Sequence, residues 1–544
     1  MSGISVYLAN RLIYQFCKAG HARFKKSLNN VEAVQRKKLS ELLEYSEQTE
    51  FGKSHNLKKE MSWEKFNETL PATIYSDWEE MILRQKNSGG LILSGEKCTR
   101  YQPTSGSTSR VKWIPYTKKF LSEIDAVVSP FAVNGYDLEK RIFRGSQYWS
   151  LSWIPTDLRK NDDSNTNDDM EVLPWWKKIF TSLTMAVPQS ISFAETSEGS
   201  MMATLAYIAA RSDLDLIFVW SPTFALNMFE QMSNHRYELV EILGKGDWCK
   251  WRKELSFIPC PRSERATVIL KDWDGALTSD FFERLWPGMA LISSWATSTS
   301  KLWADELMKL FPKATLMGKG LWATEGVVTF CFEGKYPLAV TSHFYEFMDI
   351  DSGEIFPAWK LEKGQMLKPL LTTGSGLFRY TLNDKIKVTD FIGNCPCFEF
   401  LGRLEGADMV GEKMSGEIAQ EIINTVNREF KVNALTIFAV AGEKLSGLKS
   451  RYIILCEKES SHPATEDVKK LAESILLESF HYKLARDINQ LGSAEALFHP
   501  LARRMYQKRS EIKGMILGNL KLEPLVQCSS EEWRMIISEF SETR

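Results

Sequence analysis

The chain has 544 residues, with 68 Lys and Arg against 69 Asp and Glu, and a formal net charge of -1. Its 30 Phe, 17 Trp and 16 Tyr exclude a disordered chain, and 32 Gly with 19 Pro exclude a collagen-like or low-complexity one. The balanced charge gives no electrostatic footprint for general nucleic-acid binding, and the length favours more than one domain.

The first 26 residues predict an amphipathic helix that packs on the body of the protein, in preference to a helix on a membrane surface. We expect neither a signal peptide nor an integral membrane segment, because Asn10 and Arg11 interrupt a short apolar stretch. The nine cysteines are scattered, with Cys395 and Cys397 as the only close pair. This favours buried thiols in a reducing compartment, and we expect a cytoplasmic protein.

Helices are predicted for residues 1–95, where Leu39, Leu42 and Leu43 form an apolar stripe and Pro71 marks a break. Further along, helices are predicted after Pro222 and over residues 301–310. Buried strands are predicted at residues 149–155, 214–220, 290–292 and 314–317. The polar residues 161–169 are interpreted as a surface loop rather than a metal site. Strands and helices alternate, so the predicted class is α/β.

Residues 377–400 are rich in β-branched and aromatic residues at alternating positions, which predicts antiparallel strands or a small barrel. Beyond Gly402 and Arg403 a new unit begins, with predicted helices and strands that can close a core of their own. Its helices are predicted at residues 416–430 and 466–484, and its strands at 435–440 and 452–457. A Gly-Arg step between two such regions indicates a hinge or a plain linker.

The first motif is a run of hydroxyl residues around one glycine, followed by a lysine: Thr104, Ser105, Gly106, Ser107, Thr108, Ser109 and then Lys112. Such a loop offers backbone N–H groups, hydroxyls and one cation to phosphate oxygens. It lacks the second glycine of a Walker loop, and a flexible Ser/Thr linker is the alternative.

The second motif follows a predicted strand and ends in a carboxylate: Leu321, Trp322, Ala323, Thr324, Glu325 and Gly326. A Glu beside a Thr on a turn can hold Mg²⁺, which keeps most of its waters and needs only one or two carboxylates. A hydrogen-bonded turn without a ligand is the alternative.

The third motif places Asp384 at a strand end after Arg379, Tyr380 and Thr381. A carboxylate there suits both hydroxyls of a ribose, although Asp is equally common as a turn residue. Lys413 then follows the hinge candidate at Gly402 and Arg403.

Taken in order, these motifs resemble those of the adenylate-forming superfamily and, more closely, of the auxin-responsive acyl acid amido synthetases, the Gretchen Hagen family, and their bacterial relatives. The resemblance runs from about residue 20 to the end. It implies an α/β fold with a large N-terminal domain of mixed sheets, flanking helices and a small barrel-like sheet over residues 1–402. A small mobile α+β domain would cover residues 403–544.

The resemblance also implies an ATP- and Mg²⁺-dependent ligase that converts a carboxylic acid to an acyl-adenylate and transfers the acyl group to an amine, an amino acid in the plant enzymes. Lys112, Glu325 and Lys413 would be catalytic, with Glu325 as the metal ligand. Residues around the nucleotide would be Thr104, Ser105, Gly106, Ser107, Thr108, Trp322, Ala323, Thr324, Asp384 and Arg403.

Several residues depart from the family pattern. Ser109 stands where a Gly is common, and Asn383 replaces the usual Gly before Asp384. Leu321 stands where a Tyr is usual, so adenine stacks less well or stacks on Trp322. Thr381 stands where the third motif has an Arg, and Arg379 is the nearby cation.

The acid would meet aromatic walls, for which the candidates are Trp153, Trp220, Phe224, His343, Phe344 and Tyr345. Aromatic residues at such positions are also common in simple cores, and a lone His is usually a structural hydrogen-bonding group. Two alternatives share most of these features: a ligase that forms a thioester with coenzyme A or a carrier thiol, and a non-catalytic relative that binds a nucleotide. Pyrophosphate release and the mass of the product distinguish them.

Overall fold

The computed structural model describes residues 3–103, 112–150, 182–297, 300–403, 406–407, 409, 412, 414, 416–442, 448–457, 465–487, 491–512 and 522–540. The described chain forms two compact units, the first ending at Leu401 and the second beginning at Gly402. Gly402 has a φ of 125°, a conformation that L side chains rarely adopt. The change of unit therefore falls where only glycine is unstrained.

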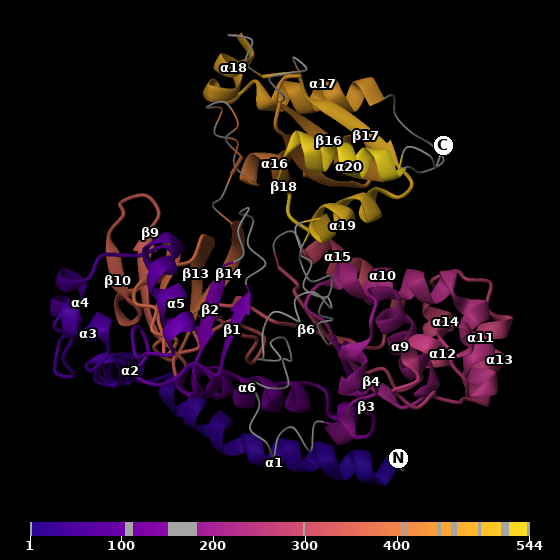
Figure 1. The fold of residues 1–544 in the computed structure, drawn as a ribbon, viewed down its shortest axis with the longest axis horizontal. Helices are drawn as coiled ribbons and strands as arrows, with labels where there is room; N and C mark the ends of the chain where they lie inside the picture. The colour runs from indigo at the N-terminus through magenta and orange to yellow at the C-terminus, as the bar shows by residue number, and fades with distance from the viewer. Residues whose placement is uncertain are drawn as a thin grey trace. The chain divides into compact units, whose positions relative to one another are not determined.

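The N-terminal helices were predicted and are confirmed. They are α1 (Gly3–Ser27), α2 (Val31–Ser46), α3 (Glu50–Ser54), α4 (Trp63–Thr69) and α5 (Tyr75–Ser88). The stripe of Leu39, Leu42 and Leu43 is buried, and Pro71 lies between α4 and α5. As predicted, α1 packs on the body, along the long helix α6 (Lys118–Leu138), as Figure 1 shows. No described helix has the length and apolar character needed to cross a bilayer.

A four-stranded parallel sheet occupies the centre of the first unit, in the order β3-β4-β5-β6. Its strands are β3 (Ser146–Trp149), β4 (Leu214–Phe218), β5 (Leu291–Ser294) and β6 (Thr315–Gly318). Three of the four predicted strands are confirmed. The fourth, predicted at 149–155, overlaps β3 only at Trp149, and its part from residue 151, like the loop at 161–169, lies outside the described residues.

Helices connect these strands, as parallel pairing requires. They are α9 (Ser197–Ala210), α10 (Pro222–Asn234), α11 (Arg236–Lys245), α12 (Arg252–Leu255), α13 (Glu264–Asp272), α14 (Ser279–Leu285) and α15 (Ser300–Leu310). The predicted helices after Pro222 and at 301–310 are confirmed, with Pro222 as the first residue of α10. Short 3-10 turns are η1 (Lys140–Phe143), η3 (Gln189–Phe193), η4 (Cys249–Trp251) and η5 (Ala358–Lys360).

A second sheet of the first unit is antiparallel, with the strand path β10-β9-β11-β13-β14 and β12 on β11. Its strands are β9 (Phe344–Asp349), β10 (Ile355–Pro357), β11 (Met366–Thr372), β12 (Tyr380–Thr381), β13 (Asp384–Ile392) and β14 (Cys395–Arg403). The expected antiparallel strands are confirmed. The barrel-like closure stays a prediction, and in the described pairings β10 and β14 are the two ends of the strand path.

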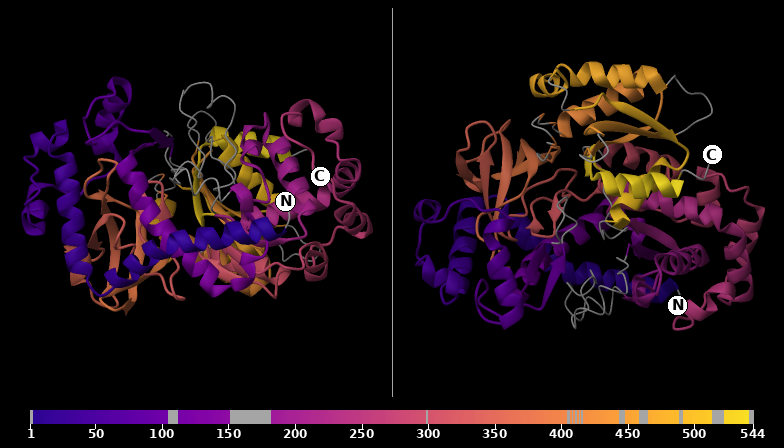
Figure 2. Two further views of the ribbon diagram at one scale, coloured as in Figure 1. Left: turned by 90° about the horizontal axis from the view of Figure 1, so that it is seen from below. Right: turned by 45° about the horizontal axis from the view of Figure 1, so that its top comes forward.

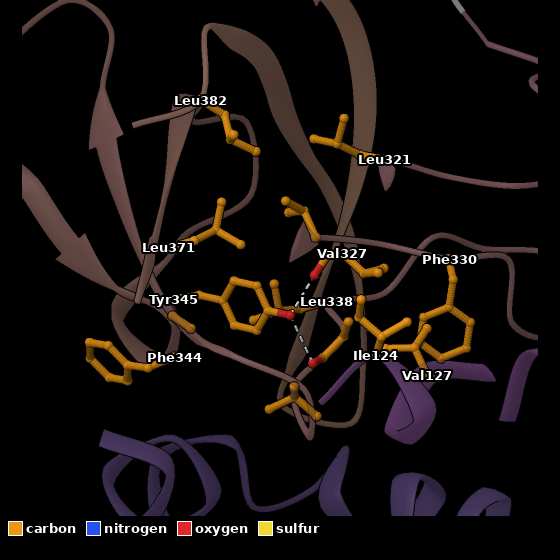
Figure 3. Close-up of a cluster of buried hydrophobic side chains, with 14 of the residues drawn as sticks. Ile124, Val127, Leu321, Val327, Phe330, Leu338, Phe344, Tyr345, Leu371 and Leu382 are labelled. Atoms are coloured by element: carbon orange, nitrogen blue, oxygen red, sulfur yellow. Dashed lines mark hydrogen bonds between the residues drawn. The ribbon is translucent and has the colours of Figure 1, made fainter. Parts of the chain in front are cut away.

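Two small hairpins complete the first unit: β1 (Arg100–Pro103) with β2 (Trp113–Tyr116), and β7 (Trp322–Ala323) with β8 (Gly326–Val327). A continuous core joins α6, the antiparallel sheet and the second hairpin. Figure 3 shows Tyr345 inside it, surrounded by Ile124 and Val127 of α6, Leu371 of β11 and other apolar side chains. The second hairpin is thus built directly onto the core.

The second unit has a four-stranded sheet in the order β17-β16-β15-β18 and a core of its own. Its strands are β15 (Ala434–Val440), β16 (Arg451–Glu457), β17 (Glu495–His499) and β18 (Leu525–Cys528). Its helices are α16 (Gly416–Phe430), α17 (Thr465–Leu476), α18 (Phe480–Asp487), α19 (Ala502–Ile512) and α20 (Ser530–Phe540). The right view of Figure 2 shows helices of this unit, drawn in gold and yellow, beside its sheet.

The predicted helix at 416–430 and both predicted strands of the second unit are confirmed. The single helix predicted at 466–484 is corrected to two helices. Glu478 and Ser479 donate backbone hydrogen bonds to the carbonyls of Ile475 and Leu476, three residues earlier, which tightens the last turn of α17 and ends it.

Candidate functional site

The second motif forms a tight β-hairpin next to the parallel sheet. Trp322 pairs with Val327 and Ala323 with Gly326, so Thr324 and Glu325 are the two residues of the turn. A Cβ on Gly326 would lie 2.8 Å from Nε2 of His343, which explains the glycine after the carboxylate. The hairpin therefore presents the partly exposed Glu325 on a turn whose backbone is closely packed.

Two tyrosines join this turn to the other motifs. The hydroxyl of Tyr380, from the third motif, lies 3.4 Å from Oε1 of Glu325. The hydroxyl of Tyr116, at the end of β2, donates to the backbone carbonyl of Thr324 at 3.1 Å. Because β2 is the strand that follows the first motif, the Thr324–Glu325 turn contacts the third motif and the flank of the first.

Asp384 is the first residue of β13 and is 8% exposed. It follows β12, whose Tyr380 reaches Glu325, so the carboxylates of the second and third motifs belong to neighbouring segments.

Lys112, immediately before β2, has its ammonium 5.7 Å from the centre of the Tyr75 ring. Arg403 is the last residue of β14.

Arg379 does not replace the arginine missing at Thr381. Its side chain is 1% exposed, and its Nε donates to Oε2 of Glu346 at 2.9 Å. Its Nη atoms donate to the carbonyls of Asn67 and Leu70 and to the amide oxygen of Asn67. The nearby cation thus belongs to a buried ion pair inside the core.

An aromatic cluster lies at the carboxyl ends of the parallel strands, the edge where open α/β sheets bind ligands. Trp149 ends β3 and stacks on Phe218, which ends β4, with ring centres 4.6 Å apart. Trp220 has its ring centre 6.0 Å from those of both Trp295 and Trp322. The predicted wall residue Trp220 is therefore part of this cluster, and Phe224 is partly buried on the helix that follows it.

Lys319 enters this cluster from the end of β6. It is 1% exposed, and its ammonium lies 2.7 Å from the centre of the Phe218 ring and 4.7 Å from that of Trp220. The indole N–H of Trp322 donates to the backbone carbonyl of Lys319 at 2.8 Å. The cluster thus combines flat apolar surfaces with one positive charge beside the Thr324–Glu325 hairpin.

Three of the remaining expected wall residues lie in the core. The side chains of His343, Phe344 and Tyr345 have no exposed surface. Tyr345 donates its hydroxyl to the carbonyls of Val327 at 2.6 Å and Ala339 at 3.1 Å, drawn as dashed lines in Figure 3. Phe344 packs against Phe66, with ring centres 6.0 Å apart. These residues support the hairpin from behind.

Leu321 is also part of this core, at 8% exposure. The first-motif residues Thr104, Ser105, Gly106, Ser107 and Thr108, together with Trp153 and Lys413, lie outside the described residues. Among the described residues, no group of three or more His, Cys, Asp or Glu side chains gathers as in a protein metal site.

Sequence reasoning missed Glu123 and Lys319. Glu123 lies on the apolar stripe of α6 between Phe120 and Val127, and a carboxylate at a buried helical position was the available signal. Lys319 follows a buried strand directly, and sequence patterns cannot tell a lysine that turns into an aromatic cluster from one that turns to solvent.

Profiles of two protein domains match the chain. The GH3 family N-terminal domain matches residues 20–316, and the GH3 family central domain matches residues 336–403. The chain is 21% identical over 418 residues to an indole-3-acetic acid-amido synthetase GH3.4 of Arabidopsis thaliana, covering 69% of this chain and 67% of that protein. It is also 21% identical over 432 residues to a 4-substituted benzoates-glutamate ligase GH3.12 of the same plant, covering 72% of each.

Solved structures share the fold. The AtGH3.15 acyl acid amido synthetase in complex with 2,4-DB matches with a TM-score of 0.78 at 18% identity, over 96% of both chains. A 2-hydroxyisobutyryl-CoA ligase matches with a TM-score of 0.53 at 10% identity, over 93% of this chain and 91% of that chain.

Proposed function

The chain belongs to the GH3 family, and from this premise we propose that it is an ATP-dependent ligase that joins a carboxylic acid to an amine through an acyl-adenylate. The observation that carries the proposal is the turn of Thr324 and Glu325, which Tyr380 of the third motif and Tyr116 beside the first both contact. A lone Thr-Glu turn means little, but a turn contacted both by the third motif and by the strand that follows the first motif supports this chemistry.

In the first half-reaction a carboxylate oxygen attacks the α-phosphorus of ATP, and the bond to pyrophosphate breaks. Negative charge on the phosphate oxygens must be stabilised throughout. We assign this to Ser105, Ser107 and Thr108 with Lys112, and to Thr324 at the α-phosphate. Thr104 and Gly106 belong to the same motif, and Asp384 would hold the ribose hydroxyls.

Glu325 would hold Mg²⁺. A single partly exposed carboxylate fits that ion, which keeps several waters and takes its remaining ligands from substrate phosphates. When bound, it would neutralise charge on the triphosphate. Trp322 and Ala323 would lie beside the nucleotide because they form the strand that leads to this turn.

In the second half-reaction an amine nitrogen attacks the acyl carbon, AMP leaves with the bonding electron pair, and the nitrogen loses a proton. Curated relatives named above conjugate indole-3-acetic acid or join 4-substituted benzoates to glutamate. We therefore propose an amino acid as the amine. Lys413, on the second unit, would approach the reacting phosphate, and the Gly402-Arg403 step would be the hinge between half-reactions.

The acid would bind against the aromatic cluster that includes Phe218, Trp220 and Trp295, with Phe224 nearby. A flat apolar body suits those rings, and the buried ammonium of Lys319 suits an anionic group. An aromatic or otherwise flat carboxylic acid is the proposed substrate class. All nine cysteines are thiols, six of them buried, which supports the proposal of a cytoplasmic location.

The test is pyrophosphate release from ATP and Mg²⁺ across a panel of aromatic and aliphatic acids, followed by mass spectrometry with amino acids or coenzyme A added. An amide product supports the proposal. A coenzyme A thioester would identify the thioester-forming alternative, whose relative shares the fold. Absence of pyrophosphate from folded protein with every acid would favour a nucleotide-binding relative without catalysis.

A further inference from the structure

A buried carboxylate–imidazole pair lies behind the Thr324–Glu325 turn. Oε2 of Glu123, on α6, is 2.8 Å from Nδ1 of His343, and the two side chains are 1% and 0% exposed. Neither group reaches the surface, so neither is a candidate to contact a substrate. Their hydrogen bonds show what they hold in place.

The backbone fixes the state of the imidazole. The N–H of Val327, the last residue of β8, donates to Nε2 of His343 at 3.2 Å. A ring nitrogen that accepts a hydrogen bond carries no proton, so Nδ1 carries the hydrogen and donates it to Glu123. The neutral imidazole thus acts as a rigid spacer between a carboxylate on α6 and the hairpin.

The same carboxylate oxygen also holds the loop before the third motif. The backbone N–H of Gly374 donates to Oε2 of Glu123 at 2.9 Å, and the hydroxyl of Thr117 donates to the carbonyl of Gly374 at 2.8 Å. A Cβ on Gly374 would lie 2.8 Å from the backbone nitrogen of Phe120, so this loop approaches α6 as closely as glycine allows. One oxygen atom therefore connects the second motif to the segment that leads into the third.

We propose that Glu123 and His343 are positioning residues for adenylation, which hold the Thr324–Glu325 turn in a fixed position relative to the third motif. The inference rests on the proposed function and adds residues to it. Tyr345 adds a further contact, because its hydroxyl donates to the backbone carbonyl of Val327. The backbone N–H of Val327 donates to His343, so buried side chains hold both backbone polar groups of Val327. A displacement of about 1 Å at a reacting centre costs about 100-fold in rate, which is why such supports matter.

The experiment compares four variants. His343→Phe keeps a ring against Phe120, on which His343 stacks, but removes both hydrogen bonds. Glu123→Leu removes the shared acceptor, whereas Glu123→Gln can place its amide oxygen where Oε2 accepts both bonds. Tyr136→Phe is the matched control, because it removes a buried hydroxyl bonded to Asn10 and Gln147 in another part of the core.

Amide hydrogen exchange is measured on peptides covering residues 322–328 and 373–377, and kcat and KM are measured by pyrophosphate release. We expect His343→Phe and Glu123→Leu to accelerate exchange in both peptides and to lower kcat by about 10- to 100-fold, with KM for the acid within about threefold. Glu123→Gln should restore most of both properties. Tyr136→Phe should leave amide exchange and kcat near their wild-type values, although it lowers thermal stability by a comparable amount.

Unchanged exchange in both peptides, or a loss of kcat equal to that of Tyr136→Phe at matched stability, would overturn the inference. Nitrogen-15 spectra of histidine-labelled wild-type protein add a measurement that needs no variant, and a protonated Nε2 on His343 would also overturn it. If wild type releases no pyrophosphate with any acid, the proposed function fails, and the exchange data still decide whether the pair holds the two segments.

Discussion

The phenolic oxygen of Tyr380 lies 3.4 Å from a carboxylate oxygen of Glu325, although 55 positions separate the two residues. That distance is long for a hydrogen bond between oxygens, so the hydroxyl orients the carboxylate only weakly, and the carboxylate keeps its charge for a cation. We expect Tyr380→Phe to reduce adenylation by about 3- to 10-fold and to raise the Mg²⁺ concentration needed for half-maximal rate. Tyr237→Phe, on an exposed ring, is the control. An unchanged Mg²⁺ response would show that Tyr380 does not act through Glu325.

Glu325→Gln should lower adenylation by about two to three orders of magnitude, because an amide keeps the shape of the side chain but removes the charge that a divalent cation requires. The turn is partly exposed, so the free energy of unfolding should change little. Pyrophosphate release and urea denaturation provide the two measurements. Glu333→Gln, at an exposed glutamate, is the control. A near-wild-type rate for Glu325→Gln would remove this residue from the metal site.

Arg379→Met should destabilise the first unit by about 3–5 kcal/mol, because it leaves Glu346 buried without its ionic partner. Among the described residues, Trp63 would still donate to that carboxylate from its indole nitrogen at 2.9 Å. The double variant Arg379→Met/Glu346→Leu should recover a large part of the loss. Urea denaturation measures all three proteins. A folded Arg379→Met variant that loses adenylation but not stability would instead assign Arg379 the role of the motif's missing cation.

The stability of the first unit should depend on pH through Asp215. Burial raises the pKa of this β4 carboxyl to about 7, and the nearby charge of Asp213 adds to the shift. The folded protein therefore keeps a proton between about pH 4 and 7 that the unfolded chain releases, so stability falls as the pH rises through that range.

Asp215→Asn has no proton to lose and should avoid this penalty. The free energy of unfolding of the variant minus that of wild type should therefore be about 2–3 kcal/mol larger at pH 8 than at pH 5. Thermal or urea unfolding at the two pH values measures the difference. An equal effect of the substitution at both values would show that Asp215 does not titrate in this range.

Lys413→Ala should slow turnover by at least about tenfold with little change in stability, if the lysine meets the reacting phosphate as proposed. The preceding Glu412 is buried, accepts the backbone N–H of Met409 at 3.0 Å and accepts the hydroxyl of Tyr452. The carboxylate of Glu412 is thus buried and hydrogen-bonded within the second unit. Lys470→Ala, at an exposed lysine of α17, is the control. Turnover equal to that of the control would make Lys413 a surface charge.

Much of the fold was predictable because local pattern and tertiary burial agree. The apolar run at 214–220 became β4, the stripe of Leu39 and Leu42 became the buried side of α2, and the alternating segment at 377–400 includes β13. The break between α17 and α18 was not predictable, because the apolar spacing continues across the turn and only a change of hydrogen bonding ends the first helix.

The candidate site, like the fold, was only partly predictable from the sequence. The order of its motifs could be recognised in the sequence because it depends on neighbouring residues, and the role of Glu325 stays a prediction. His343 was expected near the acid and lies in the core with Glu123, while Arg379 is turned away from the site toward Glu346. The order of residues along the chain shows which side chains are present, but not in which direction each one points from its strand or loop.

The amino-acid sequence by itself determined the α/β class and the family, because hydrophobic periodicity and motif order are properties of the chain. Only the tertiary structure decided the partners of the buried charges. Glu123 meets His343 across 220 positions, and Lys319 meets the rings of Phe218 and Trp220 at a sheet edge. The physical reason is that a buried charge is costly, so its location depends on hydrogen bonds and rings that distant segments bring to it, and no local pattern records those segments.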